Sequence, residues 1–284
     1  MPCGLLNLWV ARHLPRSERS DRPFDRAGAA LSALMFGLFF VSADALARDG
    51  GAALPAAAGL GAAVAAGVAL VRREARRPAP LIPVDLFRNP VFALSVTASI
   101  CAFAAFAVTF VALPFYFQTV LGRDQVATGL LMTPWPVALG LAAPLAGRLS
   151  DRLAAGALGA GGMTALAVGL ALLSRLSPDS GALAIGLMMA LCGFGFGCFQ
   201  APNNRTMLAS APRARSGAAG GMLALARLVG MTLGATVVAL VFHLAPEGAE
   251  AVGLAIGTGL GLAAAILSGL RLSRRARAGE AGRA

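Results

Sequence analysis

The chain has 284 residues, of which 57% are hydrophobic and only 13% are charged, whereas soluble domains carry roughly 25% charged residues. A soluble core of this size cannot hide so much apolar surface, so the composition excludes an ordinary water-soluble fold and indicates a protein that lies in lipid. A net charge of +11 would suggest nucleic-acid binding in a soluble protein, and here its meaning depends on where the basic residues lie.

The N-terminal segment is apolar for eleven residues, MPCGLLNLWVA, and then becomes basic. Eleven residues are too few to cross a bilayer, and no basic start or cleavage site of a signal peptide is present. We interpret residues 1–26 as the end of a truncated helix followed by a cytoplasmic segment. A short helix lying in the membrane interface is the alternative.

Eight apolar runs that can cross a bilayer as helices follow this segment. The expected spans are 27–43, 51–71, 90–117, 126–147, 154–174, 181–203, 217–242 and 251–270. The runs show no period-two alternation, and a bilayer accepts only helices or closed barrels. The predicted fold class is therefore all-α, a polytopic membrane protein with about eight transmembrane helices. Pro134 and Pro136 are expected to break the fourth span.

The basic residues are all arginines, and they alternate with the predicted crossings. Twenty of the 24 lie before the first span, after the second, fourth and sixth spans, or in the C-terminal tail. Three lie in the opposite connections, and Arg227 lies inside the seventh span. Because basic loops mark the cytoplasmic side, we expect a multi-pass protein with both termini in the cytoplasm. The charge is then loop charge that orients the chain, and no nucleic-acid partner is expected.

A short charged tract, GRLSDR at 147–152, connects the fourth and fifth spans. It resembles the signature loop of the major facilitator superfamily, G-x-L-a-D-r-x-G-r-r. The matching positions are Gly147, Leu149, Asp151 and Arg152. The match ends there, because residues 154–156 lack the next glycine and the basic pair of the pattern.

The resemblance extends over most of the chain. Residues 80–92, 113–122 and 199–230 are similar to the fourteen-helix drug:proton antiporter family, in which two extra helices separate two six-helix halves. It implies a partial major facilitator fold in a bacterial cytoplasmic (inner) membrane. The implied parts are a central helix pair (27–72), a cytoplasmic linker (73–89), a six-helix C-terminal transporter half (90–270) and a basic cytoplasmic tail (271–284).

The resemblance also implies a role for the tract in gating, in which its contacts stabilise the outward-facing state. Asp151 would lie near the N-terminus of the fifth helix, where the helix dipole favours a carboxylate by about 0.3–1 kcal/mol, and it could pair with an arginine at a neighbouring helix end. The alternative is that Ser150 and Asp151 only cap that helix.

Arg227 stands about 15 Å along its span from Gly217, near the middle of the bilayer. A charge at that depth costs at least about 2.5–3.5 kcal/mol unless it faces protein or water. We expect a substrate-cavity or coupling residue; the alternative is a structural arginine that bonds helix-end carbonyls or reaches toward the cytoplasm.

Four amide side chains are further candidates for the substrate cavity. Gln200, Asn203 and Asn204 surround Pro202, and Gln118 ends the third span. Amides beside a proline can contact substrate, or they can bond the carbonyls that the proline leaves without a donor. Trp135 is interpreted as packing.

Glycines spaced four apart in the seventh span allow another helix to approach closely. The predicted helix-packing residues are Gly217, Gly221, Gly230 and Gly234.

The functional prediction is transmembrane transport. We expect the full-length transporter to carry out proton-driven efflux of amphipathic drug-like compounds, and we expect this chain to be an incomplete half of it. No acidic residue lies well inside the last six spans, so the proton-coupling acid is expected in a missing N-terminal half. The alternatives are a non-transporting membrane scaffold or assembly partner, and a split-gene subunit that pairs with a separate first half. The expected partners are the lipid bilayer, the substrate and protons. The four cysteines and two histidines lack ligand spacing, so we expect no metal, cofactor or enzymatic site.

Overall fold

The computed structural model describes residues 25–48, 53–74, 84–177, 179–212 and 215–281, and the regular structure within these ranges is entirely helical. The α-helices are α2 (Arg26–Arg48), α3 (Ala53–Glu74), α4 (Pro90–Phe115), α5 (Gln125–Met132), α6 (Pro134–Leu149), α7 (Ala155–Leu173), α8 (Ala182–Ala209), α9 (Ser216–Leu244) and α10 (Ala249–Ala281). A 3-10 helix, η2 (Val84–Arg88), precedes α4, and a π-helical turn, η3 (Tyr116–Val120), extends it. The all-α prediction is confirmed; the truncated helix expected near the N-terminus lies outside the described residues.

The eight predicted spans are confirmed within the described part of the chain, which makes the protein a multi-pass membrane protein. Their observed limits are Ala27–Ala45, Leu54–Arg73, Pro90–Val120, Gln125–Leu149, Ala155–Leu173, Ala182–Ala209, Ser216–Leu244 and Ala249–Leu272. The third and sixth spans run past their predicted ends, to Val120 and Ala209, and their helices continue through Pro114 and Pro202.

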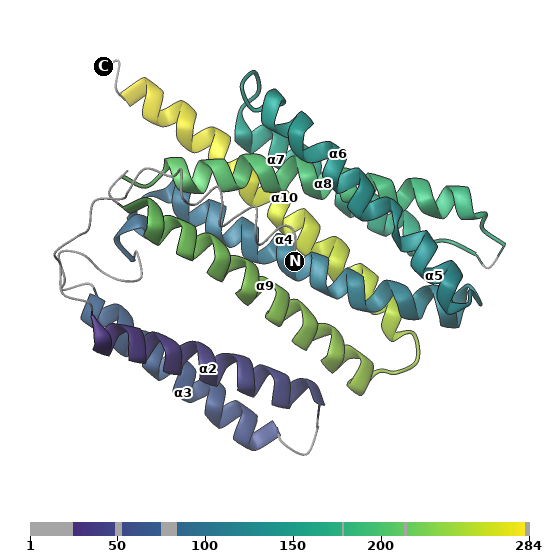
Figure 1. The fold of residues 1–284 in the computed structure, drawn as a ribbon, viewed down its shortest axis with the longest axis horizontal. Helices are drawn as coiled ribbons and strands as arrows, with labels where there is room; N and C mark the ends of the chain where they lie inside the picture. Colours follow the sequence, from purple (N-terminus) through teal and green to yellow (C-terminus); the bar gives the residue numbers. More distant parts are fainter. Residues whose placement is uncertain (1–24, 49–52, 75–83, 178, 213–214, 282–284) are drawn as a thin grey trace, which may run out of the picture.

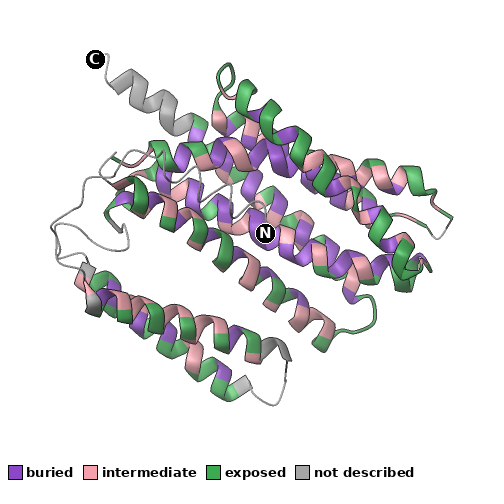
Figure 2. Cartoon of the chain, in the orientation of Figure 1, coloured by how far each residue is buried: buried purple, intermediate pink, exposed green. Residues whose placement is uncertain are grey.

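The last six spans form one helical unit (Figure 1). Within it each helix packs on the next in the order α9, α4, α10, α7, α8, α6, and α4 also contacts α8 directly. Helices α9 and α6 therefore stand at the two edges. In the spans that contain them only 22% of the most apolar stretch is buried, against 67% for α4. Figure 2 shows the buried residues concentrated toward the centre of the unit.

The helix ends meet on two sides, which we name after an acidic residue on each: the Asp151 side and the Glu247 side. On the Glu247 side, the Tyr116 hydroxyl donates to the carbonyl oxygen of Leu176 over 3.0 Å. This contact ties the end of α4 to the turn after α7, so the long third span is held at its far end.

The fourth span is two helices, α5 and α6, that meet at Thr133. The break falls just before Pro134, and α6 continues through Pro136. A proline in the first turn of a helix costs no hydrogen bond, because the first N–H groups have no partner within the helix. The predicted break is thus at the start of the Pro134–Pro136 segment and not within it.

Helices α2 and α3 form a separate antiparallel pair that lies along α9 (Figure 1). An ion pair between Arg73 and Asp25, with a nitrogen–oxygen distance of 3.0 Å, joins the two helices. The Thr236 hydroxyl of α9 lies 3.5 Å from the carbonyl oxygen of Ala43 in α2. The pair therefore covers the outer side of one edge helix.

The segment predicted as a basic tail from residue 271 differs from the expectation. Helix α10 continues to Ala281, and Arg271 is 3% exposed. Its neighbours in α4 and α8, described below, explain why this arginine lies inside the unit.

Candidate functional site

An aromatic cluster joins α4, α6 and α8 near the middle of the membrane spans. Phe103, Phe106 and Phe110 follow one another along one face of α4, at the three- and four-residue spacing of a helix. Phe196 of α8 packs against Phe103 and Phe106, with ring centroids 5.4 Å apart in both pairs. Trp135 of α6 meets Phe110 edge to face at 5.3 Å. Three helices are therefore held together by rings at mid-depth.

The placement of Trp135 follows from the break at Thr133. The new helix starts with Pro134, and its next residue, Trp135, is completely buried. Gly193 of α8 makes room for it, since a Cβ at that position would collide with the Trp135 backbone. The indole nitrogen Nε1 is buried without a hydrogen-bond partner among the described residues. The Trp135 side chain therefore packs in the interior, as the sequence suggested.

Arg227 of α9 lies over the first ring of the cluster. Its guanidinium carbon is 5.3 Å from the centroid of Phe103, a favourable cation–π distance. The side chain is exposed, and within the described ranges no acidic group forms an ion pair with it. Gly230, one turn along, lets the backbones of α9 and α4 approach closely. Arg227 thus places a positive charge beside the aromatic cluster.

A second polar group is buried on the Asp151 side, where α4, α8 and α10 meet. The Arg271 nitrogen Nη1 donates to the side-chain oxygen of Asn203 at 2.5 Å and to the Ser95 hydroxyl at 3.0 Å. The Asn203 amide nitrogen donates to the Ser99 hydroxyl at 2.7 Å. Asn203 is fully buried and Ser95 and Ser99 nearly so. These bonds connect the first, fourth and last spans of the unit.

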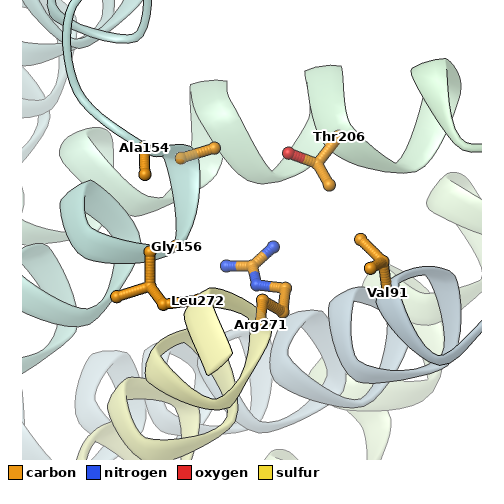
Figure 3. Close-up of a pocket in the computed structure, with 7 residues that line it drawn as sticks. Val91, Ala154, Gly156, Thr206, Arg271 and Leu272 are labelled. Carbon is orange, nitrogen blue, oxygen red and sulfur yellow. The ribbon is translucent and has the colours of Figure 1, made fainter. Parts of the chain in front are cut away.

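Arg271 also borders a small hollow at the start of α7 (Figure 3). The lining residues are Val91, Ala154, Ala155, Gly156, Thr206, Arg271 and Leu272. Sequence reasoning missed Arg271, because it is the first of a run of arginines that looks like loop charge. Asn203, predicted as a possible cavity residue, has its amide engaged by Arg271, Ser95 and Ser99.

The charged tract forms an ion pair at the surface. Asp151 accepts a hydrogen bond from Arg205, at the end of α8, over 2.8 Å, and both side chains are about two-thirds exposed. The expected cap is wrong: the N-cap position of α7 is Ala154, which makes no side-chain bond. Ser150 instead ends α6 and bonds back to the carbonyl oxygen of Ala146.

The other members of the tract, Gly147, Leu149 and Arg152, are exposed at the end of α6 and in the following turn. Among the described atoms, a Cβ at Gly147 would meet nothing within 4 Å. The tract therefore presents an open surface on the Asp151 side, tied to the unit through Asp151.

The remaining amide candidates lie in different surroundings. Gln118 is exposed and donates to the carbonyl oxygen of Pro114 in its own helix at 3.1 Å. Gln200 and Asn204 of α8 are half-buried. The structure therefore separates the four amides, with only Asn203 inside the polar group.

The two glycine pairs of α9 also differ. A Cβ on Gly230 or Gly234 would collide with the backbone of α4, so this pair sets the close approach of the two helices. A Cβ on Gly217 or Gly221 would meet nothing within 4 Å in the part of the chain that the structure describes. Gly217 and Gly221 therefore leave a smooth exposed strip on α9, at one edge of the unit.

No group of three or more His, Cys, Asp or Glu side chains that could hold a metal ion occurs in the described ranges. The chemistry that the site offers is thus contact by aromatic rings, an exposed guanidinium and a surface ion pair.

The chain matches the family model of the Major Facilitator Superfamily over residues 10–235. Over 277 residues it is 44% identical to the uncharacterized transporter YebQ of Escherichia coli strain K12, which covers 96% of this chain and 60% of that protein. It is 32% identical over 224 residues to the tetracenomycin C resistance and export protein of Streptomyces glaucescens, covering 78% of the chain and 41% of that protein.

A third relative is the riboflavin transporter RibZ of Clostridioides difficile strain 630, which is 31% identical over 166 residues, 58% of this chain and 36% of that protein. The chain spans less than two thirds of the length of each of these relatives. The family model covers most of the chain, and the relatives are named as transporters or exporters. The eight-span protein with this mid-depth site therefore belongs to the major facilitator superfamily of membrane transporters.

Proposed function

We propose that the chain forms the C-terminal half and central helix pair of a proton-driven exporter of amphipathic compounds. The observation that carries this is the mid-depth site, in which Arg227 of the edge helix α9 lies over the first of a row of aromatic rings on α4. Transporters of alternating-access type bind substrate near the midplane, where two halves meet. The name of the relative from Streptomyces glaucescens, a tetracenomycin C resistance and export protein, supports export as the direction.

The exposure of the edge helices supports a second half as partner. Helices α6 and α9 present apolar side chains such as Leu141, Leu145 and Leu228, and α9 adds the smooth strip at Gly217 and Gly221. Another set of helices would cover these faces and supply the opposite wall of the site. It would also supply the acid for proton coupling, because the acidic residues described in α4–α10 and their connections lie at helix ends or in turns.

The Asp151–Arg205 ion pair is proposed as part of the gate on the Asp151 side. Both groups are exposed, so the pair adds at most about 1 kcal/mol to stability and can break and re-form at low cost. A contact of this strength suits a conformational change better than it suits holding a fold together.

The experiment is dye efflux from energised vesicles that contain this chain, a partner half, or both. The partner is the part of YebQ that this chain does not match. We expect this chain alone to insert without efflux, and the two together to export dye in proportion to the proton gradient. In the paired protein, Asp151→Asn should lower efflux per molecule while the amount in the membrane stays the same. Proton-driven efflux by the chain alone would refute the half-transporter proposal.

A further inference from the structure

We propose that Arg227 and the rings of Phe106 and Phe110 form a subsite that selects planar aromatic compounds bearing an anionic group. The inference rests on the proposed function for its biological meaning, since it names the class of solute. The binding itself is a property of this chain and can be measured without transport.

The charge of the subsite is the first step. Arg227 is exposed, and among the described residues it lies over the ring of Phe103 without an acidic ion-pair partner. The acidic side chains described in the six-helix unit, among them Asp151 and Glu250, lie at helix ends or in turns. A guanidinium near the bilayer centre is costly without a counter-charge. An anion brought by a ligand would lower that cost.

The geometry of Arg227 is the second step. The guanidinium carbon lies over the Phe103 ring, 5.3 Å from its centroid. The N–H groups at the edge of the plane stay available, and they match two oxygens of a carboxylate or sulfonate in a bidentate contact.

The aromatic row gives the ligand its shape. Phe106 and Phe110 are only partly buried, and their rings stack with centroids 4.3 Å apart. They continue from Phe103 along the same face of α4, so the row is about 10 Å long at 1.5 Å per residue. A ligand of two or three fused or linked rings would lie against the exposed parts of Phe106 and Phe110 while its acid group meets Arg227.

A lipid headgroup is a poor match for this position. Arg227 is three residues from the middle of α9, which corresponds to about 4.5 Å along the helix axis. Lipid phosphates lie at the ends of the spans, roughly 15 Å from the centre of the hydrocarbon core. The occupant is therefore a solute that reaches the middle of the membrane, and a cation of the same shape would be repelled.

The test uses two fluorescent probes with the same rings. Anilinonaphthalene sulfonate carries an anion, and phenylnaphthylamine lacks it. The full 284-residue chain is placed in nanodiscs of neutral phosphatidylcholine, and empty nanodiscs give the background. We expect the sulfonate to bind about tenfold more tightly than the neutral probe, as one charge-assisted contact of about 1.4 kcal/mol would give.

Variants separate charge from shape. Arg227→Gln should abolish the preference, and Arg227→Lys should keep part of it. Phe106→Leu should weaken both probes alike and leave their ratio unchanged. Arg175→Gln removes an exposed arginine from a turn on the Glu247 side and should change nothing. Equal binding of the two probes to the native chain, or an unchanged ratio in Arg227→Gln, would overturn the proposal.

The outcome is distinguishable from that of the proposed function. Paired halves that export the cationic dye ethidium and ignore the sulfonate would support transport and contradict the anionic subsite. A clear sulfonate preference without efflux from paired halves would support the subsite and contradict the exporter.

Discussion

Arg205 and Arg271 lie on the same side of the protein in opposite surroundings, so loss of their partners should have different effects. Arg205 pairs with Asp151 in the open, whereas Arg271 is buried and bonded to Asn203. Exposed pairs add little to stability. A buried charged donor that loses its acceptor costs about 1.5–3 kcal/mol or more. The buried contact is therefore structural in a way that the surface pair is not.

Asn203→Ala should lower the free energy of unfolding by about 1.5–3 kcal/mol, because it removes an acceptor from Arg271 and a donor to Ser99. The measurement is thermal unfolding of the chain in detergent. Asn204→Ala is the matched control: it changes the adjacent, half-buried amide and should have little effect. Equal melting temperatures for the two variants would contradict a structural role for the buried amide.

The location of a single residue could be predicted where the neighbouring sequence already determines its surroundings. Asp151 stands in a short charged tract between long apolar spans, so its place at a helix end was evident. Arg271 was not, because only the packing of α10 against α4 and α8 places it inside. The row Phe103, Phe106, Phe110 could have been found from its helical spacing, yet apolar rings in a membrane span do not indicate which face they occupy.

Among the helices, α9 has two glycine pairs with different environments. Gly234 lies against α4, and Gly221 faces open space. Gly234→Ala should destabilise the chain by about 1–3 kcal/mol through overpacking. Gly221→Ala should be neutral or slightly stabilising, because alanine favours a helix by up to about 1 kcal/mol over glycine. Thermal unfolding of the two variants measures both effects.

Gly217 and Gly221 also allow a test of whether a second half packs on α9. If a second half packs on the Gly217–Gly221 strip, Gly221→Leu should leave the single chain stable and reduce its association with the partner half. Co-purification of tagged halves is the readout. Undiminished association would show that the partner packs elsewhere on the unit.

The helices themselves were largely predictable, because long uncharged runs in a bilayer have no alternative to a helix. The details that escaped prediction depend on neighbours. The break at Thr133 accompanies the burial of Trp135 against α8, and the π-helical turn η3 accompanies the contact from Tyr116 to the turn after α7. The continuation of α10 to Ala281 escaped because charged residues ended the apolar run that marked the span.

For the whole molecule, the distribution of arginines predicts that the Asp151 side faces the cytoplasm. In a variant without native cysteines, Glu247→Cys should react with an impermeant thiol reagent added to intact cells. Arg152→Cys should react only after the membrane is opened. Labelling of Arg152→Cys from outside would show that the predicted orientation is wrong. The gate would then not lie on the cytoplasmic face.

Of the six spans in the unit, the last in sequence is that of α10, yet α10 packs between α4, which begins the first span, and α7. Until Arg271 leaves the ribosome, Ser95 and Asn203 lack the donor that they share in the finished unit. Polar groups without partners in an apolar interior are costly, so we expect a nascent chain halted before this residue to pack its helices less tightly. The packing of the first and fourth spans is thus completed by a residue of the last span, which couples the two ends of the six-span sequence.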